Sequence, residues 1–518
     1  MTTTITNNQS ASVPSRFKLF SKIGYMEYSL LFIIISFVLR LFCIGSNKLL
    51  VEEAYYWNYA NHLDFSYLDH PPMVAVLIKL STSLLGNHEY SVRITSMMCW
   101  IVTSLFSFKL ANLIRHGTGL YAVMFLSVLP FFFLQSLAIT PDMPLMACWS
   151  ASLYYLYRAL TRNEANAWYS VGIWIGLGLL SKYTLVLLGP ATLIYMCIVP
   201  KARLWFKRKE PYLCALIAVL LFTPVIYWNA THEWASFLFQ GARRFSSDYS
   251  FSLPIFIGLF LFFFMPLGVW SLWELCKKNS DLNQEIDLDS KRFFQVFTLF
   301  PLLFFGWFSI KHSIRFDWIG PIALAIIPWQ IAVYKKSLLS NRPIIRNGWI
   351  ITALCLFLSY GLLISILLTG TPAWLNKRFF GRLIAWDALT QSFNAVAGQI
   401  EHEENKKPIF VPLDLYNIAS ELTFYQQQLL DNQLISTAYP VIGRHIFGSD
   451  SLMYRYWSVN EDLSGKLLIL ISRDLNDFKR VDSQRVIEKS PMKSIWSLNS
   501  GKNLNVEPYY YKVVEMTR

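Results

Sequence analysis

The sequence predicts a polytopic α-helical membrane protein with a small α/β domain after its last membrane span. Only 15% of the 518 residues are charged, whereas 54% are hydrophobic. So few charges cannot cover the surface of so apolar a chain in water. Two of several apolar runs, at 30–44 (LLFIIISFVLRLFCI) and 350–368 (IITALCLFLSYGLLISILL), approach the roughly 20 residues that cross a bilayer core.

Apolar segments follow one another from residue 27 to residue 370 and predict about eleven membrane spans. The loops between them are basic on alternate sides, and the positive-inside rule assigns the basic loops to the cytoplasm. The first span lacks a small-residue cleavage site, so we expect it to remain as an anchor that follows a cytoplasmic tail. The basic loops lie near residues 115, 157, 201, 276 and 334.

The sequence changes character after about residue 371, where the long apolar runs stop. Short β-type stretches at 409–413, 466–472 and 509–516 alternate with a helix-like stretch at 417–430. An odd number of spans places this region on the outer side. The predicted parts are a cytoplasmic tail (1–26), a transmembrane domain (27–370) with a first outer loop at 47–92, and an outer α/β domain (371–518).

Charge and cysteine content argue against two other classes of protein. The formal net charge is +13, but the basic residues are scattered between apolar segments and form no single stripe, so we expect no nucleic-acid partner. The seven cysteines lie in or beside apolar spans and include no CxxC pair. The sequence therefore indicates neither a disulfide framework nor a cysteine zinc site.

Two adjacent glutamates, Glu52 and Glu53, follow the first span at the outer membrane boundary. Ionisable side chains that face a membrane bundle are costly and usually have a partner or a function. Aromatic residues surround them (AYYWNYA, 54–60) and offer flat faces suited to a sugar. The carboxylates are either solvated loop residues or candidates for a general base.

Asp69 and His70 precede two prolines, Pro71 and Pro72, which stiffen the chain at the start of the next helix. An ordinary helix-start histidine is one interpretation of His70. A carboxylate and an imidazole can also bind a metal together, or the imidazole can donate to a phosphate. The sequence does not choose between these possibilities.

Two further polar positions lie at outward ends of spans. Asp142 stands between prolines, where it can cap the helix that begins near Met143, and a cap residue can also be functional. Lys182 interrupts an apolar stretch, where it either snorkels to the interface or offers a cation to a phosphate.

Outer loops carry four more cations, although basic residues are rarer on this side. A lipid phosphate at the membrane surface is their natural anionic partner. Carboxylates, cations and aromatic faces thus converge on one side of the bundle, which suggests an enzyme whose substrate carries a phosphate at that surface. These cations are Arg243, Arg244, Lys311 and Arg315.

Several blocks in this order resemble the bacterial glycosyltransferase family 39 proteins. That family includes relatives of the dolichyl-phosphate-mannose protein mannosyltransferases and the lipid A aminoarabinose transferases. The resemblance covers most of the chain, and the DHPP and WNATHEWASFLFQ blocks are its most specific parts. The blocks are 52–82 (EEAYYW through DHPP to KLST), 140–145 (TPDMPL), 176–190 (GLGLLSKYTLVLLGP), 223–244 (TPVIYWNATHEWASFLFQGARR) and 416–425 (YNIASELTFY).

This resemblance implies a GT-C membrane fold in the bacterial inner membrane, with an active site and an α/β domain in the periplasm. It implies a sugar donor linked to undecaprenyl or another polyprenyl phosphate, transfer with inversion, and no nucleotide cofactor. It leaves open a divalent metal ion. The acceptor that it favours is lipid A or another envelope component, with Ser or Thr of a protein as the alternative. It indicates no oligomeric state.

The resemblance also assigns roles to residues. The acidic pair of the first outer loop falls on Glu52 and Glu53, but the first position is usually Asp, so Glu52 reaches one methylene further. It implies three groups of site residues: catalytic Glu52, Glu53 and Asp142; donor phosphate-binding His70, Arg93, Lys182, Arg243 and Arg244; and metal-binding Asp69 and His232.

Two alternatives come from other classes of protein. A lipid or sugar transporter would also be polytopic, but transporters often show inverted repeats and charges near the bilayer midplane. This sequence shows neither, because its charged motifs gather at one face. A non-catalytic scaffold would not need that gathering.

Overall fold

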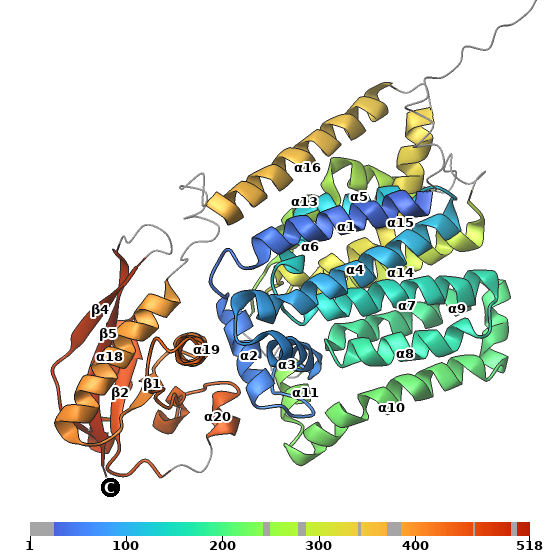
Figure 1. Ribbon diagram of the computed structural model, residues 1–518. Coiled ribbons are helices and arrows are strands. Elements are labelled where there is room, and N and C mark those ends of the chain that lie inside the picture. The colour runs from blue at the N-terminus through green and yellow to red at the C-terminus, as the bar shows by residue number, and fades with distance from the viewer. Residues whose placement is uncertain are drawn as a thin grey trace, which may run out of the picture.

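The computed structural model describes residues 25–241, 249–277, 286–339, 343–369, 385–458, 462–498 and 505–517. A long helical bundle carries a mixed α/β unit at one end, and two shorter helices, α2 (Val51–Asn61) and α3 (Met73–Leu85), lie where the two parts meet (Figure 1). The polar residues singled out from the sequence are concentrated at this junction.

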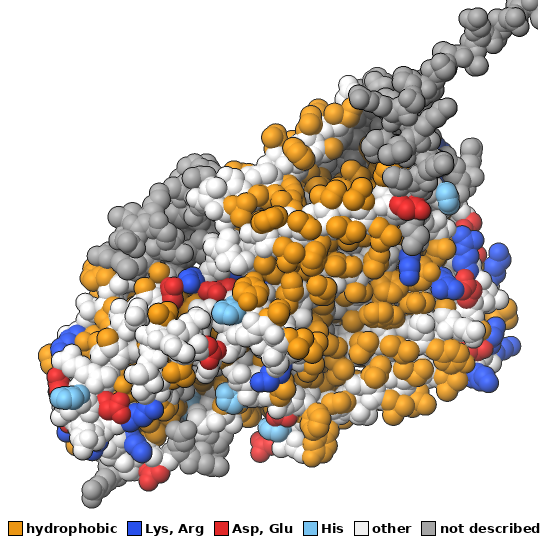
Figure 2. All heavy atoms as spheres, in the orientation of Figure 1, with side chains coloured by type: hydrophobic (Ala, Val, Ile, Leu, Met, Phe, Trp, Pro, Cys, Tyr) orange, Lys and Arg blue, Asp and Glu red, His pale blue; other side chains and the backbone are white. Residues whose placement is uncertain are grey.

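The bundle is built around α7 (Asp142–Arg162), which is buried along most of its length and packs against α4 and α8. Outer helices expose apolar side chains, such as Phe42 on α1 and Phe357 on α16, as a membrane helix must. Figure 2 shows hydrophobic side chains spread over this face of the bundle. The other bundle helices are α1 (Tyr25–Ile44), α4 (Glu89–Ile114), α5 (Gly119–Val128), α6 (Pro130–Ser136), α8 (Ala167–Leu179), α9 (Leu188–Ile198), α10 (Glu210–Thr231), α13 (Leu253–Cys276), α14 (Leu288–Phe308), α15 (Gly320–Leu339) and α16 (Pro343–Thr369).

The bundle has the character of a polytopic membrane protein. Within the described ranges, 4 helices are long and apolar enough to cross a membrane, or up to 6 if each of two bent pairs counts as one span. Two further helices of the bundle fall short for simple reasons. Helix α8 has only 13 residues, and α7 combines arginine with serines and tyrosines, which lower its mean hydropathy. The eleven spans therefore stay a prediction.

The C-terminal unit contains a five-stranded sheet of order β1-β2-β5-β3, with β4 paired to β5. Strand β1 runs parallel to β2, and the other pairs are antiparallel. Every residue of β1 and β2 is buried, because the sheet is covered on both faces. The strands are β1 (Ile409–Pro412), β2 (Leu467–Ser472), β3 (Val486–Glu488), β4 (Lys493–Leu498) and β5 (Asn505–Met516).

Two helices, α18 (Trp386–Glu404) and α19 (Asn417–Asp431), cover the face of the sheet that turns toward the bundle (Figure 1). The strands and the helix expected from the sequence at 409–413, 466–472, 509–516 and 417–430 are all present. Residues 370–384 lie outside the described ranges, so the domain boundary near 371 stays a prediction.

The predicted first outer loop is folded and mostly buried. Helix α19 packs directly on α2, where Trp57 meets Phe424 edge to face at 5.1 Å and Tyr55 lies 4.6 Å from Tyr416 between ring centroids. The side chain of Lys48, just before α2, forms a 2.8 Å ion pair with Asp387 on α18. The C-terminal unit thus holds the loop from outside.

A buried carboxyl group lies in this contact. Glu421, on the face of α19 toward α2, is fully buried, and among the described residues neither of its oxygens has a hydrogen-bond partner. Burial raises the pKa of Glu421 well above its usual range, and the neighbouring Glu53 raises it further. The folded protein therefore favours the protonated form of Glu421 more than the unfolded chain does.

Replacing Glu421 by glutamine should reduce the pH dependence of stability. Because the pKa of Glu421 is higher in the folded protein than its ordinary value of 4.5, the folded protein binds this proton more tightly. Stability from this group is then full below about pH 4.5 and declines as the pH rises toward the folded-state pKa. Thermal unfolding of detergent-purified protein between pH 5 and 8 should show a smaller loss for Glu421→Gln than for the parent.

Glu404→Gln, at an exposed position of α18, is the matched control and should follow the parent. Equal losses for Glu421→Gln and the parent would show that Glu421 is already ionised in the folded protein.

Candidate functional site

A cavity of about 560 Å3 lies beneath the junction between bundle and C-terminal unit. Its walls come from the start of α2, the turn before α3, the start of α7, the turn after α8, and the short helix η6 (Phe316–Trp318). Polar side chains that are far apart in the sequence meet here. Those that concern the chemistry are Glu52, His70, Asp142, Lys182, Arg315 and Asp317.

Glu52 turns into this cavity from the first turn of α2. Its side chain is half-buried, and in the described part of the chain no hydrogen bond or ion pair engages its carboxylate. A carboxylate in a cavity without a protein partner is available to a substrate. The structure therefore leaves Glu52 free to act in the role predicted for it.

Glu53 is 0% exposed and fully engaged. It forms an ion pair with Arg93, whose Nη2 lies 2.7 Å from Oε2, and it accepts backbone N–H groups of Leu50 at 2.9 Å and Ile139 at 3.0 Å. These bonds tie the start of α2 to α4 and to the segment before α7. Glu53 lines the cavity, but its carboxylate is used to hold α2 in place.

Arg93 is equally committed. Its Nε and Nη2 donate to the carboxylate of Glu53. Its Nη1 donates to the backbone carbonyls of Ile44 at 2.8 Å and Asn47 at 2.9 Å, and the second N–H of Nη2 donates to the backbone carbonyl of Lys48 at 2.8 Å. A guanidinium has five N–H groups, and these bonds use all of them. The phosphate contact predicted for Arg93 would have to break one of them.

Lys182 lies between two carboxylates. Its Nζ is 2.7 Å from Asp142 Oδ1 and 2.5 Å from Asp317 Oδ2, and Arg315 Nε lies 3.6 Å from the other oxygen of Asp317. Burial raises the pKa of Asp317, but the ammonium of Lys182 outweighs it and lowers the pKa to about 2. Two cations and two carboxylates thus form one cluster in the cavity wall.

The structure changes the interpretation of Asp142. The helix begins at Asp142 itself with Pro141 as its N-cap, and no side chain caps it, so the capping interpretation is wrong. The carboxylate turns to Lys182 instead. Sequence reasoning expected Arg315 to face a lipid phosphate as one of four outer cations. It missed Asp317, although the run KHSIRFDW places both residues in an outer loop.

Asp69 and His70 lie on the loop between α2 and α3. Asp69 accepts hydrogen bonds from the hydroxyls of Tyr55 at 3.3 Å and of Tyr59, and its carbonyl accepts one from the side chain of Gln240. His70 lies against Tyr56, with ring centroids 5.7 Å apart, and lines the central cavity. The pair is thus fixed in direction, as the prolines predict.

A second cavity, of about 230 Å3, adjoins the first and shares His70, Lys182 and Trp318 with it. Its other walls are mainly apolar, and Val186 at its edge is exposed on the bundle surface. An apolar cavity that ends at a lysine and a histidine suits a lipid tail that carries a polar head. The apolar lining includes Val186, Leu187, Phe304, Phe305 and Phe308.

Both predicted metal ligands, Asp69 and His232, bond to other protein groups. His232 caps the end of α10, stacks on Trp228 at 4.1 Å, and has its Nδ1 2.9 Å from the Trp228 carbonyl. Across the described ranges, no three His, Cys, Asp or Glu side chains converge as a metal site. A metal ion stays a prediction.

Arg243 and Arg244 lie outside the described residues.

Residues 69–228 match the family model described as dolichyl-phosphate-mannose-protein mannosyltransferase. The chain is 24% identical over 252 residues to lipid A galacturonosyltransferase RgtD of Rhizobium johnstonii, covering 45% of this chain and 50% of the relative. It is 24% identical over 320 residues to undecaprenyl phosphate-alpha-4-amino-4-deoxy-L-arabinose arabinosyl transferase of Pectobacterium atrosepticum, covering 57% of this chain and 54% of the relative. The chain thus matches about half the length of these curated relatives.

The fold matches that of ArnT from Cupriavidus metallidurans. The structure of ArnT bound to undecaprenyl phosphate superposes with a TM-score of 0.63 and 12% identity, covering 93% of this chain and 97% of ArnT. The apo structure of ArnT superposes with a TM-score of 0.62 and 13% identity, covering 94% of this chain and 98% of ArnT. The predicted resemblance is confirmed, and the chain has the fold of ArnT.

Replacing Glu53 by alanine should destabilise the protein much more than replacing its neighbour Glu52. Loss of Glu53 leaves the guanidinium of Arg93 buried without its carboxylate, which costs about 3 to 5 kcal/mol. No described residue bonds to the Glu52 carboxylate, so Glu52→Ala should change the unfolding free energy by only about 0.5 kcal/mol. Thermal unfolding of both variants in detergent checks this difference. Similar melting temperatures for the two would contradict the bracing role of Glu53.

Proposed function

We propose that this protein is an inverting glycosyltransferase that moves a sugar from a polyprenyl phosphate, such as undecaprenyl phosphate, to lipid A or another envelope acceptor. The relatives named above act on lipid A or on an undecaprenyl phosphate sugar, and ArnT shares the fold. The observation that carries the proposal is the cavity in which Glu52, whose carboxylate has no partner among the described residues, shares walls with the cluster of Lys182 and Arg315.

The donor fits across the two adjoining cavities. Its isoprenoid chain would enter the apolar cavity, and its phosphate would lie at the shared wall formed by His70 and Lys182. Lys182 uses two of its three ammonium protons on Asp142 and Asp317, which leaves one for the phosphate. The side chain of Arg315 is 62% exposed and its ion pair is long, so its guanidinium can turn to the phosphate.

The reaction is a displacement at the anomeric carbon. The acceptor oxygen attacks, the bond between this carbon and the phosphate oxygen breaks, and the polyprenyl phosphate leaves with the electron pair. Lys182 and Arg315 stabilise the charge that develops on the leaving phosphate. Glu52 accepts the proton of a hydroxyl acceptor, whereas an ionised phosphate acceptor needs no base and Glu52 then orients it.

Asp142 has a different role in this proposal from the catalytic one predicted. Its carboxylate contacts Lys182 at 2.7 Å and fixes the direction of the ammonium group, so we assign it as a positioning residue. The residues present offer carboxylates and imidazoles to a metal ion, but no step requires one.

We place the cavity and the C-terminal unit on the periplasmic side of the inner membrane, with about eleven spans and a cytoplasmic N-terminus. The distribution of charge supports this orientation. The connection from α9 to α10, which carries the exposed Lys201, Arg203 and Lys207, lies at the end of the bundle away from the C-terminal unit (Figure 1). Figure 2 shows a group of basic side chains at that end. Basic residues gather on the cytoplasmic side of membrane proteins.

Glu52→Gln and Lys182→Met should each abolish sugar transfer while the protein remains in the membrane. The first removes the unpartnered carboxylate and the second removes a cation from the leaving phosphate, and either loss should lower transfer by at least about 100-fold. Mass spectrometry of lipid A from cells with the gene, without it, and with each variant measures the added sugar. Lys79→Gln, on α3 outside the cavity, is the control and should retain transfer.

Normal transfer by both variants would remove the proposed site. If lipid A were the same in cells with and without the gene while the glycoprotein profile differed, the acceptor would be a protein and not lipid A.

A further inference from the structure

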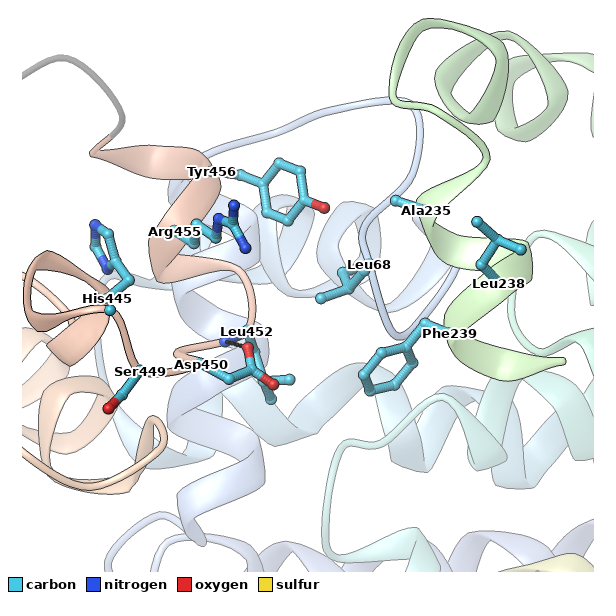
Figure 3. Close-up of a pocket in the computed structure, with 11 residues that line it drawn as sticks. Leu68, Ala235, Leu238, Phe239, His445, Ser449, Asp450, Leu452, Arg455 and Tyr456 are labelled. Atoms are coloured by element: carbon cyan, nitrogen blue, oxygen red, sulfur yellow. Dashed lines mark hydrogen bonds between the residues drawn. The ribbon is translucent and has the colours of Figure 1, made fainter. Parts of the chain in front are cut away.

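A third cavity, of about 670 Å3, lies outside the central site, between the C-terminal unit and the bundle. Helix α11 (Ala235–Gln240) and Leu68 form one wall, and the segment from His445 to Tyr456, which ends in the short helix α20 (Tyr454–Trp457), forms the other (Figure 3). Nothing in the donor pathway described above uses this space.

Arg455 supplies a cation to this cavity. Its side chain is exposed, and within the described residues it has neither a hydrogen bond nor an ion pair. Figure 3 shows Arg455 and Tyr456 next to each other on α20, across the cavity from Leu68, Leu238 and Phe239. An arginine with all its donors free presents the planar fork that matches a phosphate or carboxylate.

Two other titratable groups line the cavity. The ring of His445 is held by Ser451 Oγ at 2.9 Å and Ser458 Oγ at 3.1 Å, and burial together with Arg455 lowers its pKa, so it is neutral near pH 7. Asp450 accepts the N–H of Leu452 at 3.1 Å. Among the described residues that line this cavity, Arg455 is therefore the cation.

The opposite wall is apolar and partly exposed. Leu238 is 55% exposed and Phe239 turns its ring into the cavity, as Figure 3 shows. Trp234, immediately before α11, is 48% exposed, and tryptophan favours the membrane interface. A cavity with an aromatic wall and a free guanidinium suits a sugar ring that carries an anionic group and is anchored to a lipid.

The cavity also touches the reaction site through a shared wall. Leu68 lines this cavity, and His70, two residues later, lines the central one. The same segment is fixed from both sides, because the N–H of Leu68 contacts the sulfur of Met453 at 3.2 Å and Gln240 of α11 donates to the Asp69 carbonyl. The Leu68–His70 segment therefore borders both cavities.

We propose that this cavity is the acceptor subsite, and that Arg455 binds an anionic phosphate on the sugar headgroup of the lipid acceptor. The proposal rests on the glycosyltransferase function above and adds which side the acceptor comes from. The donor phosphate lies at His70 and Lys182, and the acceptor headgroup lies beyond the Leu68–His70 segment. The two substrates then approach the central cavity from different directions, as displacement with inversion requires.

Steady-state kinetics with the full-length protein in detergent test this assignment. The acceptors are phosphorylated lipid A and the same lipid A after phosphatase treatment. Arg455→Gln should raise the KM for phosphorylated lipid A by about 10-fold or more, because a charge-assisted hydrogen bond is lost. The KM for the polyprenyl phosphate sugar should stay within about twofold. Arg485→Gln, at an exposed position of the same unit, is the control and should match the parent.

The dephosphorylated acceptor separates a specific contact from a general effect. The parent should prefer phosphorylated lipid A, and Arg455→Gln should lose that preference. Two results would overturn the assignment: an unchanged KM for phosphorylated lipid A in Arg455→Gln, or a KM that rises equally for both acceptors.

Direct binding keeps this test independent of the proposed activity. If the parent transfers no sugar to either acceptor, the glycosyltransferase proposal fails, and binding of fluorescent phosphorylated lipid A then decides the subsite. Binding that is about 10-fold weaker for Arg455→Gln supports the subsite, and equal binding overturns it. Inorganic phosphate at the same concentration should not displace the lipid, because the apolar wall contributes to binding, and displacement would count against a lipid headgroup.

Discussion

The buried ion pair between Glu53 and Arg93 is the interaction on which the reaction cavity depends. It joins the first turn of α2 to α4, and the same carboxylate accepts the N–H of Ile139 just before α7. Successive residues of a helix point about 100° apart, so fixing Glu53 inward fixes the direction of Glu52 as well. The buried carboxylate of Glu53 would be costly without Arg93, and its ion pair with Arg93 directs the side chain of Glu52 into the cavity.

The C-terminal unit completes this arrangement from the other side. Its helix α19 covers α2, and its segment around Met453 holds Leu68. The loop that carries Asp69 and His70 is thereby clamped between the bundle and the unit, with the central cavity on one side and the Arg455 cavity on the other. One short loop thus separates the two proposed substrate paths, and its position depends on both parts of the protein.

The sequence predicted the polar positions better than their partners. Composition and apolar runs were enough for the membrane class, and Glu52, His70, Asp142 and Lys182 do line one cavity. The two glutamates are neighbours in the sequence, so the sequence could not show that Glu53 forms an ion pair and Glu52 forms none with a described residue. The difference depends on Arg93, which is 40 residues away from Glu53. Local capping rules misassigned Asp142 for the same reason, since Lys182 is distant in sequence. Asp317, 135 residues from Lys182, carried no local signal of its role.

The pairing of Lys182 with two carboxylates has a consequence for the proposed chemistry. Lys182, Arg315, Asp142 and Asp317 carry two positive and two negative charges, so the empty cluster is close to neutral and has little tendency to trap anions tightly. A donor phosphate diester carries one negative charge, and the leaving phosphate gains another as the bond breaks. Arg315, held to Asp317 only at 3.6 Å, can follow that growing charge, while Lys182 stays fixed. In the proposed reaction, this cluster therefore gains more attraction to the leaving phosphate than to the donor diester, which is the difference that catalysis requires.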